Sequence, residues 1–194
     1  MTRLALVGLI VVAASFDVPV DARPGPPLVC HQLDIGTAGS LPWKDGPFGM
    51  DPGFPIQRVA AETERILAAS DDAVVHMETL RRAYIYLGIG SDEPGLLALG
   101  ALLKERIIDS ETTENVGVER ARQDALAWFD LGYLMAIIEN NGGPILTPRS
   151  SSRRILERAP SPRMFWPDIH FGVGYALTGN HQPGPVATSR RRPA

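Results

Sequence analysis

The fold of this chain is decided by residues 117–139, GVERARQDALAWFDLGYLMAIIE. From Ala125 to Ile138 the only charged residue is Asp130, so the helix that this stretch predicts is apolar on nearly every face. Such a helix lies in the centre of a core or in a membrane. These 14 residues span about 21 Å, which is too short for a bilayer core of ~30 Å. We therefore expect a central core helix.

Length and composition are those of an ordinary globular protein. The 194 residues suit one domain, and 44% are hydrophobic and 21% charged. A net charge of −3 predicts no strong attraction to nucleic acid or anionic lipid. We expect residues 58–179 to form a single helical domain and residues 180–194, with the basic run 190–192, to be a disordered tail.

The N-terminus has the layout of a secretory signal peptide over residues 1–22. A basic start at Arg3 precedes an apolar run over residues 4–16, and small residues follow. Cleavage fits after Ala14 or after Ala22, and we favour Ala22 because a Pro/Gly-rich segment begins there. We expect a periplasmic or extracellular protein with no stable membrane span after removal of the signal. The alternative is an uncleaved N-terminal membrane anchor.

Residues 23–57 predict an ordered but irregular arm. They contain seven prolines and six glycines, too many for a regular helix or a central strand. Apolar residues are interspersed along the segment, which is not typical of a solvated linker. We expect these residues to lie over the helical body. Cys30 is the only cysteine, so no internal disulfide forms. We expect a buried, inert thiol, with pairing between molecules as the alternative.

The remaining pattern predicts an all-α fold. Apolar residues spaced by three and four indicate helices over about 55–69 and 72–87, and from a cap at Ser91 to about Ser110. We expect these helices to form hairpins around the central helix 117–139. A short helix is expected near 152–158. Residues 168–178 alternate as a strand does, but Pro167 favours a helix start and no partner strand exists, so we expect a last helix.

Short segments of the chain resemble known families. Trp128-x-x-Leu131-Gly132 resembles the opening of a tetratricopeptide first helix, which implies helical-hairpin packing and no particular partner. Residues 28–31 (LVCH), 40–43 (SLPW) and 78–83 (ETLRRA) are together similar to uncharacterised exported bacterial helical proteins. That resemblance implies export and no known activity.

Asp130 is the first candidate for chemistry because no partner lies at helical spacing from it. An isolated buried carboxylate is costly, so it finds a partner or takes up a proton. We expect an ion pair with Arg81 or Arg82. The alternative is a carboxylic acid with a raised pKa in a pocket, suited to acid–base catalysis.

His76 and Glu78 are further candidates, but they lie two residues apart and point to different faces of a helix. Local helical pairs account for both: His76 with Asp72, and Glu78 with Arg81 and Arg82.

No pattern indicates a metal or cofactor site. Cys30 and His31 are adjacent in an extended segment, so their side chains point to opposite sides. His170 and His181 are isolated, and no phosphate loop, nucleophile elbow or dinucleotide fingerprint occurs. We expect no cofactor and no metal.

The sequence favours a non-catalytic, exported helical domain that binds another protein or an envelope component. The alternative is a small hydrolase-like enzyme that uses Asp130 or Glu78 as a buried carboxylate, with His76 and Arg81 or Arg82. A third candidate function is the carriage of a small ligand or a metal.

Overall fold

The computed structural model describes residues 28–45, 48–112, 117–142, 146, 151–159 and 166–179. Within these ranges the chain has six α-helices and no strands, which confirms the all-α prediction. The helices are α1 (Val59–Ala68), α2 (Ala73–Tyr84), α3 (Glu93–Thr112), α4 (Val118–Asn140), α5 (Ser152–Leu156) and α6 (Pro167–Gly179). A 3-10 turn, η1 (Ile56–Arg58), precedes α1, and a π-helical turn, η2 (Ile85–Ile89), follows α2. The predicted signal peptide and tail lie outside the described residues.

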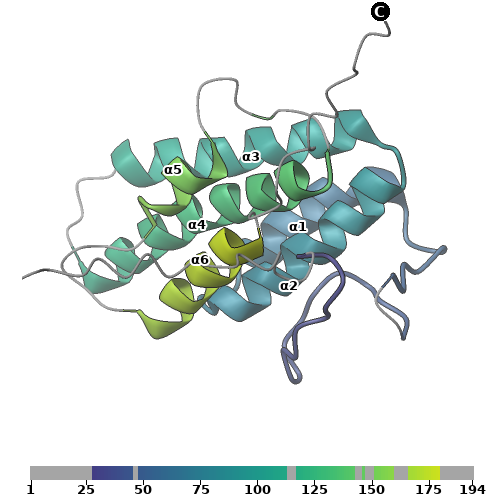
Figure 1. The fold of residues 1–194 in the computed structure, drawn as a ribbon, viewed down its shortest axis with the longest axis horizontal. Coiled ribbons are helices and arrows are strands. Elements are labelled where there is room, and N and C mark those ends of the chain that lie inside the picture. The colour runs from purple at the N-terminus through teal and green to yellow at the C-terminus, as the bar shows by residue number, and fades with distance from the viewer. Residues whose placement is uncertain are drawn as a thin grey trace, which may run out of the picture.

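Helix α4 occupies the centre of the fold, as its sequence predicts. Helices α2, α3, α5 and α6 all pack against it (Figure 1). From Ala125 to Ile138 every side chain except the half-buried Trp128 is buried. None of the helices among the described residues combines the length and apolar composition that a membrane span requires. The apolar faces of α4 are therefore buried in the protein core.

Helices α1 and α2 meet at a tight turn that places His76 near the core. Residues 69–72 separate them, and the Asp72 carboxylate accepts a hydrogen bond from the backbone N–H of Val74 at 2.8 Å. The structure places the N-cap of α2 at Asp72, whereas the sequence pattern favours Ser70 or Asp71 for that role. Helix α1 also packs against α3, and α3 packs against α4.

Helix α5 approaches α4 closely because Gly132 has no side chain. A Cβ atom on Gly132 would lie 2.8 Å from Cγ of Leu156. At the start of α5, the backbone N–H and the hydroxyl of Ser152 both donate hydrogen bonds to the Glu139 carboxylate, at 2.9 and 2.6 Å. The Gly132 contact and this carboxylate cap fix the short helix along α4.

We expect Gly132→Ala to lower the free energy of unfolding by about 1–2 kcal/mol. The added methyl collides with Leu156, and this loss exceeds the helix propensity that alanine gains. Gly174→Ala is the matched control, because nothing lies within 4 Å of its Cβ position. We expect this substitution to raise the free energy of unfolding by up to ~1 kcal/mol. Urea unfolding measures both. Equal effects of the two substitutions would contradict the close approach.

Residues 167–179 form helix α6, as expected, despite their strand-like alternation. The glycine at 172 lies against α4: a Cβ there would be 2.6 Å from Cζ of Phe129. Asp168 in the first turn of α6 accepts hydrogen bonds from Arg122 of α4 and from the backbone N–H of Ala73. The alternation therefore reflects a small residue at a helix contact and does not mark a strand.

The described part of the arm before η1, residues 28–45 and 48–54, lies against α2 and η2 without helical structure (Figure 1). Leu28, Val29 and Leu41 are buried in the core. Cys30 is exposed, so the prediction of a buried thiol is wrong. The chain turns at residues 28–30, and burial of the two apolar residues before Cys30 leaves the thiol on the outside.

Candidate functional site

Asp130 is buried at the junction of α2, α3 and α4, where two cationic side chains meet its carboxylate. Oδ1 lies 2.7 Å from Nδ1 of His76, and Oδ2 accepts a hydrogen bond from Nη1 of Arg106 at 2.8 Å. His76 and Asp130 are both 0% exposed, whereas the Arg106 side chain is 21% exposed. We call these three residues the central ion cluster. The prediction that Asp130 forms an ion pair with Arg81 or Arg82 is therefore wrong.

The error has a simple geometric cause. Successive helical residues are separated by about 100°, so Arg81 and Arg82 lie on faces of α2 that are more than 90° from the face of His76. His76 faces α4, and the two arginines face the arm. The helical spacing of Arg106 favours the solvent side of α3, but its aliphatic length lets the guanidinium reach inward.

Both ring nitrogens of His76 have oxygen partners. Nε2 lies 3.0 Å from the backbone carbonyl of Ser70, and Nδ1 faces Asp130. A carbonyl oxygen only accepts hydrogen bonds, so Nε2 carries a proton, and a carboxylate at Nδ1 favours a proton there as well. This pair of oxygen partners favours the imidazolium form of the ring. The predicted local pair of His76 with Asp72 is wrong, because His76 spans from the α1–α2 turn to α4.

The charge balance agrees with this protonation. Burial alone lowers the pKa of His76, and the Arg106 guanidinium lowers it further. The charge and hydrogen bond of Asp130, with the Ser70 carbonyl, outweigh both effects, so the pKa of His76 lies above its ordinary value.

This shift predicts a loss of stability as the pH rises above about 6.5. A histidine whose pKa is raised by folding contributes stability that is complete below its unfolded pKa of about 6.5 and is lost as pH rises through its folded pKa. We expect the free energy of unfolding to fall over that window, and the fall to disappear in His76→Gln. Urea unfolding at a series of pH values tests this. A decline of equal size in both proteins would assign the effect to other groups.

A groove of about 430 Å³ opens beside the central ion cluster. Arg106 connects the groove with the cluster, because its guanidinium binds Asp130 and the residue also lines the groove. Ser70, whose carbonyl faces His76, is a second shared residue. The wall comes from the end of α1 and the α1–α2 turn, from α3, and from the first half of α4. The lining residues are Leu67, Ala68, Ala69, Ser70, Asp71, Arg106, Asp109, Glu119, Arg120, Gln123, Leu126 and Ala127.

Sequence reasoning did not identify this groove. Its charged residues come from three separate segments, and each has the exposure expected of an ordinary helix surface. The only available signal was Asp130 itself, since a carboxylate inside an apolar helix requires a cation from a neighbouring helix.

Glu78 lies in a second buried cluster, on the arm side of α2. Its carboxylate accepts hydrogen bonds from Arg81 and Arg82, with the shortest contact to each at 2.7 Å, and from the backbone N–H of Leu33 at 3.0 Å. This confirms the predicted local pairs. Burial raises the pKa of Glu78, but these donors outweigh burial and hold it below its ordinary value.

The two arginines of this cluster bind the arm. Arg81 donates to the carbonyl of Val29 at 3.0 Å, and Arg82 donates to the carbonyl of Leu41 at 2.8 Å. Their guanidinium carbons lie 4.9 and 5.4 Å from the ring centroid of Trp43. We call Glu78, Arg81 and Arg82 the arm-binding cluster. It gives an irregular segment partners for its backbone groups.

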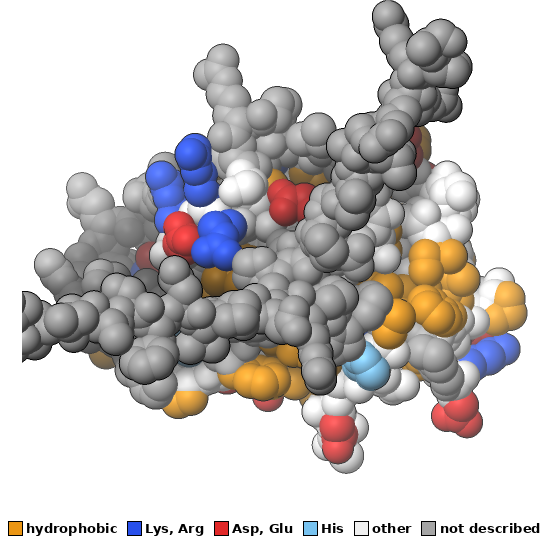
Figure 2. Space-filling view, in the orientation of Figure 1, with side chains coloured by type: hydrophobic (Ala, Val, Ile, Leu, Met, Phe, Trp, Pro, Cys, Tyr) orange, Lys and Arg blue, Asp and Glu red, His pale blue; other side chains and the backbone are white. Residues whose placement is uncertain are grey.

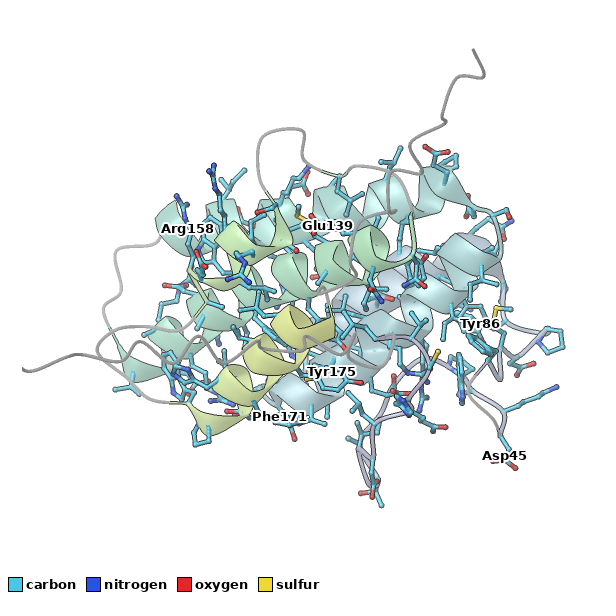
Figure 3. All side chains as sticks on the ribbon, in the orientation of Figure 1. Asp45, Tyr86, Glu139, Arg158, Phe171 and Tyr175 are labelled. Carbon is cyan, nitrogen blue, oxygen red and sulfur yellow. The ribbon has the colours of Figure 1, made fainter. Side chains whose placement is uncertain are left out.

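The arm also has an aromatic contact with η2. The hydroxyl of Tyr86 donates to the carbonyl of Pro42 at 2.6 Å and accepts from the N–H of Asp51 at 2.7 Å. Figure 3 labels Tyr86 and, farther out along the arm, Asp45. The Tyr86 ring packs edge-on against Trp43 and Phe54.

The candidate residues therefore separate into two groups. Asp130 and His76 belong to the central ion cluster, whereas Glu78 and Arg81 belong to the arm-binding cluster. Cys30 and His31 are exposed on the arm, and His170 lies on α6. Across the described ranges, no three His, Cys, Asp or Glu side chains are grouped as a metal site would need. His181 lies outside those ranges.

No protein-family model, curated protein or solved structure matched this chain. The geometry above therefore carries the functional argument.

Proposed function

We propose that this protein is an exported, non-catalytic helical domain that binds another protein or an envelope component through the groove beside Arg106. One observation carries the proposal: the buried ionisable groups beneath the groove are fully engaged with one another. The imidazole of His76 bridges Ser70 and Asp130, and Asp130 is shared between His76 and Arg106. Such a cluster holds helices in place and offers a partner a shaped surface.

The hydrolase-like alternative has less support. A general base needs a lone pair within reach of a substrate proton. Nε2 of His76 is engaged by a carbonyl, and the ring is 0% exposed. Glu78 and Arg81, which the alternative combines with His76, bind the arm instead.

The groove lining fits a polypeptide partner. Arg106 and Arg120 line it together with Asp71, Asp109 and Glu119, so charges of both signs lie close to apolar side chains such as Leu67 and Leu126. Mixed charge around an apolar floor is typical of protein-binding surfaces. Ile108 and Val118, the sequence neighbours of Asp109 and Glu119, are 58% and 65% exposed. Exposed large apolar side chains next in sequence to lining residues support a binding role for this part of the protein.

Site-specific photocrosslinking in the producing cells tests this proposal. A benzophenone amino acid at Gln123 places the probe in the groove, and the same probe at Ala101 places it on an exposed position of α3 outside the lining. We expect a discrete crosslinked adduct from position 123 and none from position 101. No adduct at 123, or the same adducts at both positions, would refute binding through the groove.

A further inference from the structure

Helix α5 and the turn after it have two sharply different faces. Ser152, Ile155, Leu156 and Ala159 are buried against the fold. All four residues between them point outward and are exposed: Arg153, Arg154, Glu157 and Arg158. The outward face carries three positive charges and one negative charge. We call these four residues the α5 face, and Figure 2 shows blue and red side chains gathered over this helix.

The positive charge of this face is only weakly neutralised. Arg153 lies 3.7 Å from Glu157, and both side chains are more than half exposed, at 54% and 56%. The attraction within an exposed ion pair of this kind is weak, because water and salt screen it. Arg154 forms no ion pair with any residue in the described part of the chain.

Arg158 lies against an aromatic ring and keeps its donors. Its guanidinium carbon is 4.8 Å from the ring centroid of Trp128. A guanidinium beside an aromatic ring still has N–H donors for other acceptors. Figure 3 labels Arg158 just after α5 and Glu139 near the start of the helix, where Glu139 is engaged by Ser152. The basic end of the face therefore lies away from that carboxylate.

The sequence around α5 concentrates the positive charge further. Residues 149–163 hold five arginines and one glutamate, a net charge of +4, although the whole chain carries −3. The net charge of the chain predicted no general attraction to anionic lipid. The four described residues of the α5 face alone carry a net charge of +2, and this local excess reverses that expectation for this surface.

We propose that the α5 face binds the surface of an anionic phospholipid membrane. Guanidinium groups match phosphate oxygens in geometry and charge, and a row of them on a short helix reaches several headgroups at once. Trp128 beneath Arg158 suits the same setting, because tryptophan is enriched at membrane–water interfaces. The proposal does not rest on the groove, which lies at a different surface and is lined by other residues.

Flotation of the purified full chain with lipid vesicles tests the proposal. One set contains phosphatidylcholine alone and the other equal parts of phosphatidylcholine and phosphatidylglycerol. We expect preference for the anionic vesicles, and loss of that preference in about 1 M salt, where the Debye length is ~3 Å. The apolar N-terminal run is present in every variant, so the anionic-to-neutral binding ratio isolates the arginines.

Combined replacement of Arg153, Arg154 and Arg158 by glutamine should lower binding to anionic vesicles on the order of a hundred-fold, since each arginine near such a surface contributes about five-fold. The matched control replaces Lys44, Arg58 and Arg65 by glutamine, which removes the same charge from exposed positions elsewhere. It should keep most of the preference. The single substitution Arg154→Gln should lower binding to anionic vesicles about five-fold. It provides the test if the triple variant does not fold.

Three results would overturn the proposal. The first is equal binding to both vesicle types, and the second is an equal loss in the two triple variants. The third is binding of the protein to a short DNA duplex at a lower phosphate concentration than binding to the anionic vesicles requires, which would assign the α5 face to nucleic acid.

Discussion

We expect the substitution Asp130→Asn to lower the free energy of unfolding by about 3–5 kcal/mol, because it leaves His76 and Arg106 without their counter-charge. His76 and Asp130 are 0% exposed, so water cannot replace the lost carboxylate charge. The amide keeps the size of the side chain, so the loss reports charge and hydrogen bonding with little contribution from a cavity. Urea unfolding, monitored by far-UV circular dichroism, measures the effect.

Asp124→Asn is the matched control for this substitution. Asp124 lies on the same helix, six residues earlier, and pairs with Arg120, but its side chain is 38% exposed. We expect a change of less than about 1 kcal/mol. If Asp130→Asn lowers the free energy of unfolding no more than Asp124→Asn does, the central ion cluster does not stabilise the fold. Asp130 would then again be a candidate for a functional acid.

The second large effect is expected at Glu78. Glu78→Gln leaves the buried guanidinium groups of Arg81 and Arg82 side by side without a carboxylate, and we expect a loss of about 3–5 kcal/mol. The Leu33 N–H loses a charged acceptor in the same step. Because the cluster binds the arm through backbone carbonyls, hydrogen exchange of residues 28–45 should rise more than that of α4.

The control for Glu78 is Glu62→Gln. Glu62 also pairs with an arginine, three residues later, but the Arg65 side chain is 65% exposed. We expect unchanged exchange in the arm and a loss below about 1 kcal/mol. An arm that stays protected in Glu78→Gln would show that burial of Leu28, Val29 and Leu41 holds it without the cluster.

The features that the sequence predicted correctly are local. The apolar girth of α4 appears in consecutive residues, and the pairs of Glu78 with Arg81 and Arg82 lie at helical spacing. The last helix was predicted in spite of an alternating pattern, because Pro167 marks a helix start and a lone strand would leave its backbone unpaired.

The features that could not be predicted depend on how the helices are rotated against one another. A carboxylate in an apolar helix requires a cation, but the sequence does not say which face of α2 meets α4. His76 and the two arginines were equally available, and Arg106 had the spacing of a solvent-facing residue. Cys30 shows the same limit within the arm, where one turn at residues 28–30 decides which side chain is buried.

The protonation of His76 tests the central claim most directly, because a structural ion cluster and a catalytic base require different states of its ring. Long-range ¹⁵N–¹H correlation spectra of the folded protein at about pH 7 report both ring nitrogens. We predict two protonated nitrogens, the pattern of an imidazolium held between Asp130 and the Ser70 carbonyl. A neutral ring with its lone pair on Nε2 would contradict the account, because it would place a base beside the groove.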